Sequence, residues 1–275
     1  MTNSVLTNSS ALIALQNLNS TNQKLAATQN RVNTGLKVQG AKDNAATWAI
    51  AQNQRADTGA LEAVKTSMNR ATSLADVSLA AGEQISDLLI EMRQKATSAA
   101  DPSASAASRK AYDDEFQSLL KSLTSFAMNA TFDGENILNG TSTTTLDFLA
   151  NVGATEIISM DRQDMTLTGL GLGGAIDLTN AANANAALTA VIAAIDTSSA
   201  SLAELGAQAK QIEKHTTFVS KLMDSLETGI GNLVDADMAK ESARLQALQV
   251  QQQLGAQALS IANQAPQIIL SLFKG

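Results

Sequence analysis

The most constraining feature of the chain is an uncharged, helix-forming stretch near its C-terminal end. From Leu245 to Phe273 the sequence contains no Asp, Glu, Lys or Arg. Apolar residues nevertheless recur there at spacings of three and four residues, the period at which two helices stay in contact over a long distance. The residues on this seam are Ala247, Val250, Leu254, Ala258, Ile261, Ile268 and Leu272.

A second apolar line runs along a neighbouring face of the same stretch. It consists of Leu245, Leu248, Leu259 and Ala262. An uncharged helix with more than one apolar side is not a solvated surface helix. Because Gln and Asn interrupt every apolar run, it is not a membrane span either. The stretch therefore requires neighbouring helices.

The start of the chain has the same character. No charged residue precedes Lys24, and polar Asn22 and Gln29 fall on the same line as the apolar residues. Polar residues at such positions usually fix the register of a helix pair. We expect the two ends to pair with each other and with copies of themselves, as assembly elements. The apolar residues on the N-terminal line are Leu12, Leu15, Leu18, Leu25, Val32 and Leu36.

The middle of the chain predicts further long helices. Asp101-Pro102 ends the first of them, because the residue before a proline is pushed out of helical geometry. A second helix is expected from about Ser105 to Ala130, and helical periodicity resumes near Leu188, with Ile192 and Ile195 on its apolar face. The first helix carries a five-heptad seam of Leu61, Val64, Met68, Ala71, Ala75, Ser78, Gly82, Ile85, Leu89, Met92, Ala96 and Ala99.

Between these helices the pattern changes to Thr-rich and Gly-rich segments. Residues 139–183 contain short β-prone runs such as Glu156–Met160 and Met165–Leu170. Such runs between turn residues are typical of hairpins. The predicted fold class is mainly α: a long antiparallel helical coiled-coil rod with a small β-hairpin insert.

Composition excludes several classes of function. The net charge is −7 without a basic stripe, which argues against nucleic-acid binding. Cysteine is absent, so the chain has no disulfide framework and no cysteine metal site. The N-terminus lacks the pattern of a signal peptide. We expect a protein that is cytosolic or leaves the cell by a route that does not read such a peptide.

No group of residues predicts catalysis, a cofactor or a metal. His215 is the only histidine, and a partly packed helix position is favoured over a catalytic base or ligand. Asp235, Asp237 and Glu241 lack the glycine turn of a calcium loop. We expect them to be helix N-terminal acids that pair with Lys240 or Arg244. The chain is not expected to be an enzyme.

At both ends, the residues resemble those of a bacterial flagellin, and the resemblance covers nearly the whole length. The chain resembles alphaproteobacterial flagellins in particular. The matching segments, specific when taken together and in order, are RVNTGL at 31–36, AKDNAA at 41–46, LVDADMAKE at 233–241, QALSIANQ at 257–264 and ILSLF at 269–273.

The resemblance implies a domain organisation and a function. Residues 1–40 and 233–275 are expected to form the inner D0 helices, and residues 41–232 the D1 helical rod with the hairpin insert at about 139–183. The subunit is expected to polymerise through its terminal helices into the extracellular flagellar filament used for motility. Expected partners are copies of itself, other flagellins in a mixed filament, an export chaperone, the type III export apparatus, the filament cap and hook-associated proteins, with neither nucleic acid nor membrane among them.

Two alternatives and one surface feature remain open. A hook–filament junction protein shares the terminal helices, whereas an intracellular coiled-coil scaffold would keep charges up to its ends. Flagellins detected by a Toll-like receptor carry a pattern of the form L-Q-R-x-R-E-L. Here Glu91 stands at the first Arg of that pattern and Lys95 at its last Leu. Both residues are therefore candidates for evasion of the receptor.

Overall fold

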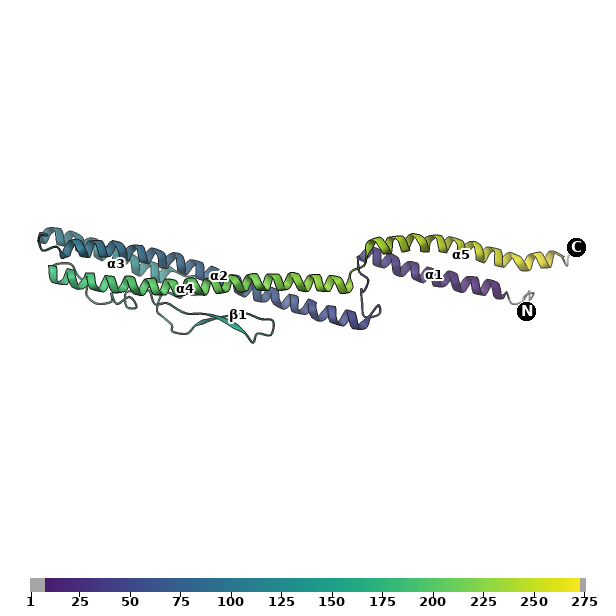
Figure 1. Ribbon diagram of the computed structural model, residues 1–275, viewed down its shortest axis with the longest axis horizontal. Coiled ribbons are helices and arrows are strands. Elements are labelled where there is room, and N and C mark those ends of the chain that lie inside the picture. Colours follow the sequence, from purple (N-terminus) through teal and green to yellow (C-terminus); the bar gives the residue numbers. More distant parts are fainter. Residues whose placement is uncertain (1–7, 273–275) are drawn as a thin grey trace. The chain divides into compact units, whose positions relative to one another are not determined.

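The computed structural model describes the backbone of residues 8–272 and the side chains of residues 8–264. Its elements confirm the predicted fold class, mainly α with a small β-hairpin insert (Figure 1). In chain order they are α1 (Ser9–Thr34), α2 (Ala45–Ala100), α3 (Ala106–Asn129), β1 (Leu146–Leu149), β2 (Ile157–Met160), α4 (Ala181–Val234) and α5 (Met238–Leu272).

The chain divides into two compact units. Unit 1 comprises Met1–Ala56 and Ser225–Gly275, and unit 2 comprises Asp57–Asp224. The first and last parts of the sequence therefore belong to one folded body. The domain boundaries expected at residues 40/41 and 232/233 stay a prediction.

In unit 1, local sequence sets the ends of the helices. The Asn8 side chain caps α1 by accepting a hydrogen bond from the Ala11 amide at 3.1 Å. Gly35 ends α1 in the left-handed conformation, at φ 72°. The Asn44 side chain caps the start of α2, since its Oδ1 accepts from the Thr47 amide at 3.1 Å.

Helices α1 and α5 lie side by side and run in opposite directions (Figure 1). The start of α1 meets the far part of α5, where the Asn8 side chain donates to the Ala262 carbonyl at 2.7 Å. The end of α1 meets the start of α5, where Arg31 reaches Glu241. The expected pairing of the two ends of the chain is thus present.

Unit 1 also contains a small buried apolar cluster, formed by the segments that adjoin this helix pair. Val38, Ala51 and Val234 are buried at its centre, and Trp48 packs against them. The backbone ties the same segments together, because the Lys37 amide donates to the Val234 carbonyl at 2.7 Å. The segments that follow α1 and precede α5 are therefore held to each other.

In unit 2, the predicted seam of α2 is confirmed. All twelve positions from Leu61 to Ala99 are buried. At Gly82 the neighbouring helix comes close, since a Cβ there would lie 2.6 Å from Cδ2 of Leu202 on α4. Small residues on a seam permit such an approach, and larger ones would separate the helices.

The predicted apolar face of α4 is wrong in its first half. Leu188 and Ile195 are only half-buried and Ile192 is exposed, whereas the buried line consists of Ala184, Ala187, Val191, Ala194 and Ser198. The smaller residues take the interior because they let the helices pack closely. By length and composition alone α4 could cross a membrane, and it is the one such helix in the described part of the chain. Its buried line belongs instead to the interior of unit 2.

The hairpin is antiparallel, and its register pairs Leu146 with Met160 and Leu149 with Ile157. Side chains of two helices hold it in place. At its edge, the Leu149 amide donates to Oγ of Ser67 on α2 at 3.1 Å. His215 of α4 binds the Ala150 carbonyl at 2.7 Å.

One predicted strand is absent from the described residues. Met165–Leu170 forms turns, in which the Leu170 amide donates to the Thr166 carbonyl at 3.0 Å. The Asp164 side chain accepts a hydrogen bond from the Thr166 amide at 3.0 Å, so this amide is not available for pairing with another strand. The strand prediction at Glu156–Met160 holds for Ile157–Met160.

Candidate assembly surface

The interface between α1 and α5 uses the second of the two apolar lines predicted for α5. On α5 the covered residues recur every three or four positions: Glu241, Leu245, Leu248, Gln252, Gly255, Leu259 and Ala262. On α1 they are Ala11, Ala14, Leu18, Thr21, Leu25, Thr28 and Val32. We call these residues the inner line. Of the predicted N-terminal seam it contains Leu18, Leu25 and Val32.

The two helices approach closely in the middle of the inner line. Gly255 has no side chain, and a Cβ there would lie 3.2 Å from Cδ1 of Leu18. Leu18 therefore rests against the backbone of α5. Nearby, Nε2 of Gln252 donates to the side-chain Oδ1 of Asn22 at 2.8 Å. This bond gives Asn22 the register-fixing contact that its place on the seam predicted.

A charged contact marks the other end of the pair. Arg31 donates to Oε1 of Glu241 at 3.4 Å, and Glu241 is buried. The expected partners of Glu241 were Lys240 or Arg244 on its own helix, and this expectation is wrong. Glu241 faces α1, so the nearest cation comes from the opposite arm of the chain.

The first predicted line of α5 points away from α1. Val250 is 55% exposed, Leu254 58% and Ile261 69%, and Ala247 and Ala258 are exposed as well. On α1, Leu12 and Leu15 are exposed too, at 59% and 43%, together with Ile13, which the seam prediction missed. We call these eight exposed residues the outer line. The side chains of Ile268 and Leu272 lie outside the described residues.

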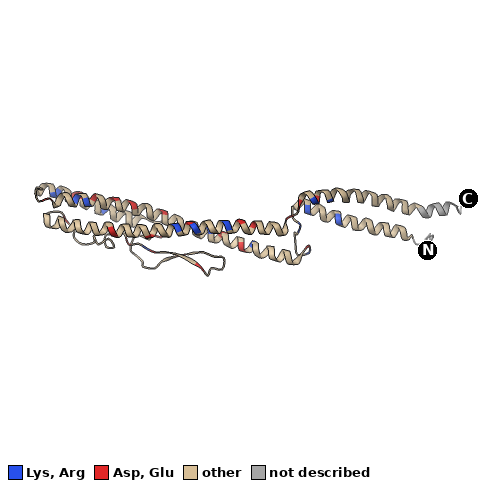
Figure 2. Cartoon of the chain, in the orientation of Figure 1, with Lys and Arg blue, Asp and Glu red and all other residues tan. Residues whose placement is uncertain are grey.

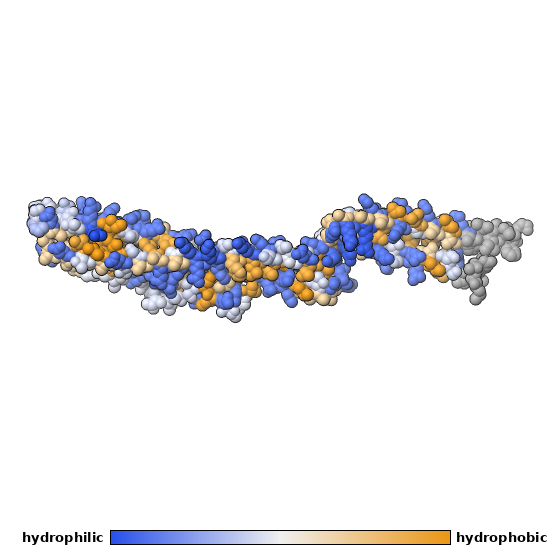
Figure 3. Space-filling view, viewed as in Figure 1, coloured by the Kyte–Doolittle hydropathy of each residue, from blue (hydrophilic) through white to orange (hydrophobic). Residues whose placement is uncertain are grey.

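The outer line lies on a surface that carries no charge. The described part of α1 before Lys24, and α5 beyond Arg244, contain no charged side chain (Figure 2). Apolar residues show on the same part of the pair in the space-filling view (Figure 3). A surface that is uncharged and apolar on an extended helix is suited to contact with further helices.

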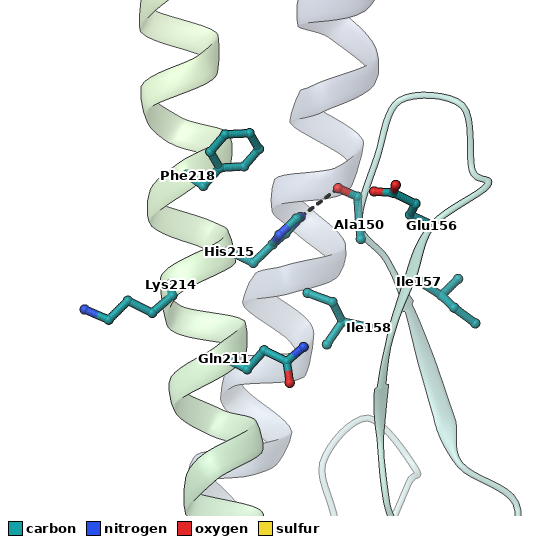
Figure 4. A pocket seen from close by; sticks show the side chains of 8 residues that line it. All are labelled: Ala150, Glu156, Ile157, Ile158, Gln211, Lys214, His215 and Phe218. Atoms are coloured by element: carbon teal, nitrogen blue, oxygen red, sulfur yellow. Dashed lines mark hydrogen bonds between the residues drawn. The ribbon is translucent and has the colours of Figure 1, made fainter.

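The structure gives the other candidate residues structural contacts. His215 donates through Nε2 to the Ala150 carbonyl in a shallow hollow, with Phe218 5.9 Å from it between ring centroids (Figure 4). It attaches the hairpin to α4. Within the described residues, no group of three or more His, Asp or Glu is placed to hold a metal ion.

Glu91 and Lys95 both lie on α2, one turn apart. Glu91 is exposed, whereas Lys95 forms an ion pair with Glu115 on α3. The hydrogen bond that Lys95 donates to the Glu115 carboxylate is the main cause that raises the pKa of Lys95. Lys95 is therefore oriented towards α3, and Glu91 is free to meet solvent or a partner.

Comparison with known proteins agrees with this geometry at both arms. The pattern described as the bacterial flagellin N-terminal helical region matches residues 5–143, and that of the bacterial flagellin C-terminal helical region matches residues 188–273. Together they cover most of the chain and both helices of the assembly surface. The chain belongs to the bacterial flagellin family.

Individual flagellins are similar over the full length of the chain. Flagellin FljM of Caulobacter vibrioides is 51% identical over 272 residues, which cover 99% of both chains. A flagellin of Brucella melitensis is 41% identical over 283 residues, with the same coverage. Among solved structures, a putative flagellar hook-associated protein from Vibrio parahaemolyticus shares the fold, with a TM-score of 0.58 at 14% identity over 70% of this chain and all of that one. As a flagellin, the chain is a structural subunit that self-assembles into an extracellular flagellar filament.

Proposed function

We propose that this flagellin assembles through the outer line of its terminal helices, which copies of the chain cover in the filament. The observation that carries the proposal is that α5 has two apolar lines, of which only one contacts α1. The inner line is covered by contacts within the subunit. The outer line is apolar and uncharged, and within the subunit it stays exposed.

The energetics favour association over exposure. Covering one large aliphatic side chain contributes roughly 1.5–3 kcal/mol. Four of these side chains are each more than half exposed in the single chain: Leu12, Val250, Leu254 and Ile261. Each would therefore contribute when a neighbouring subunit covers it. The pair of α1 and α5 alone cannot bury these side chains, because they point away from the contact between the two helices. Neighbouring subunits supply the missing helices.

The lack of charge serves the same end. A carboxylate or ammonium group in a dry helix interface costs several kcal/mol unless it is paired. The described residues of α5 beyond Arg244 include none. Copies can therefore surround this part of the pair without leaving a buried charge.

The proposal extends to the route and partners of the subunit. We assign residues 1–40 and 233–275 to the inner D0 domain and residues 41–232 to D1. The subunit is exported by the type III export apparatus, with an export chaperone, and meets the filament cap and hook-associated proteins. It forms a homopolymer or a mixed filament with other flagellins. The resemblance of both arms to flagellins supports these assignments, and the chain has no catalytic role.

The test compares two Asp substitutions that lie two residues apart. Ala258→Asp places a carboxylate on the outer line, whereas Ser260→Asp places one on an exposed polar face of the same helix. Under polymerising conditions, sedimentation should find Ala258→Asp in the supernatant and Ser260→Asp in the pellet. Removal of residues 265–275 should also abolish polymerisation. Normal filaments from Ala258→Asp would show that the outer line is not an assembly surface.

A further inference from the structure

The segment that leads into the hairpin contains the single Asn-Gly pair of the sequence, Asn139-Gly140. The backbone nitrogen after an asparagine is positioned to attack the side-chain carbonyl carbon of that asparagine, which closes a five-membered ring. A side chain on the following residue hinders the attack, and glycine has none. The pair is therefore the position of the chain most open to this reaction.

The local structure prepares the side chain of Asn139 for attack. Its Oδ1 accepts two hydrogen bonds, from the Thr141 amide at 3.1 Å and from the Thr141 hydroxyl at 2.8 Å. The turn they form encloses both Cγ of Asn139 and the amide nitrogen of Gly140. The same two donors would stabilise the negative charge that develops on Oδ1 when the nitrogen bonds to Cγ.

The fold also requires the glycine. Gly140 has a φ of 65°, and a Cβ there would lie 2.6 Å from the carboxylate of Asp164. Asp164 is itself held by the Thr166 hydroxyl and amide. Next to it, the Met165 amide donates to the Leu138 carbonyl at 3.0 Å. Any larger residue at position 140 would clash, so the reactive pair is retained by packing.

We propose that Asn139-Gly140 is a self-modification site, at which the folded chain converts Asn139 to aspartate or isoaspartate. The Gly140 nitrogen forms a bond to Cγ of Asn139, the bond from Cγ to Nδ2 breaks, and the amide proton leaves with Nδ2 as ammonia. Water then adds to one of the two carbonyls of the cyclic imide and opens it. Gly140 and Thr141 are exposed, so ammonia leaves and water enters freely.

The conversion changes the base of the hairpin irreversibly. It replaces a neutral amide by a carboxylate on the residue next to Gly140, which itself lies against the Asp164 carboxylate, and like charges at short range repel. The isoaspartate form also adds one carbon to the backbone between Leu138 and Gly140. Because the reaction proceeds at a constant rate per molecule, the converted fraction measures the time since a subunit folded.

The experiment incubates the purified full-length protein in water enriched in heavy oxygen and maps its peptides by mass spectrometry. Asn151 is the internal control. Its Oδ1 also accepts two amides, those of Thr155 at 3.0 Å and Glu156 at 3.3 Å, but the next residue is the β-branched Val152. Heavy oxygen should enter residue 139 at least about tenfold faster than residue 151.

A variant tests the role of the hydroxyl. Thr141→Val removes one donor to Oδ1 and should slow the conversion by about tenfold, since oxyanion donors contribute that much or more when they are preorganised. Far-UV circular dichroism checks that the variant is folded. Equal rates at residues 139 and 151, or an unchanged rate in Thr141→Val, would overturn the proposal. So would a sugar on Asn139, whose Asn-Gly-Thr sequence fits a glycosylation acceptor, because a substituted amide is no longer lost as ammonia.

Discussion

Arg31 on α1 reaches Glu241 on α5 at 3.4 Å, and this ion pair joins the two terminal helices of the chain. Glu241 is buried, and its second oxygen, Oε2, has no hydrogen-bond partner in the described part of the structure. A buried carboxylate that depends on one cation is costly to leave alone.

We therefore expect Arg31→Ala to weaken the pairing of α1 with α5 by about 1–3 kcal/mol, the usual cost of an unsatisfied buried polar group. Hydrogen exchange of the amides in both helices measures the loss. Combining it with Glu241→Gln should restore part of the protection, because the remaining group is neutral. Identical exchange in wild type and Arg31→Ala would show that the ion pair does not contribute.

Gly82 offers a test of close packing in unit 2. A larger side chain there meets Leu202 and Met165, so Gly82→Val should lower the free energy of unfolding by about 1–3 kcal/mol. Gly59 lies on the same helix with open space around it. Gly59→Ala should instead raise stability by about 0.5–1 kcal/mol, because glycine is unfavourable within a helix. Urea unfolding distinguishes the two, and equal effects would contradict the packing argument.

Asp177 makes the start of α4 sensitive to acid. Its pKa is lowered, first by the Asn183 side-chain amide and then by the Thr179 hydroxyl and amide. A lowered pKa in the folded state means that the stabilisation is present above the unfolded pKa of 3.8 and is lost as the pH falls through the folded value.

The first turns of α4 should therefore open more readily as the pH drops below 3.8. Hydrogen exchange of residues 181–187, corrected for the intrinsic pH dependence, follows the opening. Asp177→Asn should be less protected at neutral pH and should lose this response to acid. A variant with the same pH response as wild type would assign the effect to another group.

Glu91 and Lys95 predict poor detection by the Toll-like receptor that recognises flagellins. Glu91 is exposed and opposite in charge to the Arg of detected relatives, and like charges across an interface suppress binding. We expect monomers to be at least about a hundredfold weaker stimulants than a detected flagellin. Glu91→Arg with Lys95→Leu should recover part of the response in a reporter-cell assay.

Glu83→Arg is the matched control, because it reverses an exposed charge on the same helix outside the receptor pattern. It should leave the response unchanged. A wild-type monomer as potent as a detected relative would contradict the prediction. Since Lys95→Leu also removes the ion pair with Glu115, the double variant should be checked for folding by circular dichroism.

The long helices were predictable because a heptad seam is a repeated signal. The seam of α2 from Leu61 to Ala99 is buried at every predicted position, since each heptad confirms the phase of the next. In the first half of α4, the prediction placed the wrong face of the helix in the interior. There the interior is built from Ala184, Ala187 and Ala194, and larger residues beside them gave the stronger but misleading pattern.

The sequence also left open which line of α5 faces α1. Both lines are apolar and both follow the heptad period, so periodicity alone does not rank them. The choice depends on contacts between distant residues: the fit of Leu18 over Gly255 and the bond between Asn22 and Gln252. Likewise, the strand predicted at Met165–Leu170 gave way to turns set by Asp164, a local side-chain effect that β-propensity does not include.

The two lines on α5 limit how the length of the terminal helices can change. A single inserted residue rotates everything beyond it by about 100° around the helix axis, which would misplace the inner and outer lines together. An insertion of a whole heptad keeps both lines to within about 20°. The contacts of Asn8 with Ala262 and of Arg31 with Glu241 fix the two ends of the antiparallel pair, so α1 would have to lengthen by the same step. Lengthening of this pair is thus expected to occur in matched seven-residue increments on both arms.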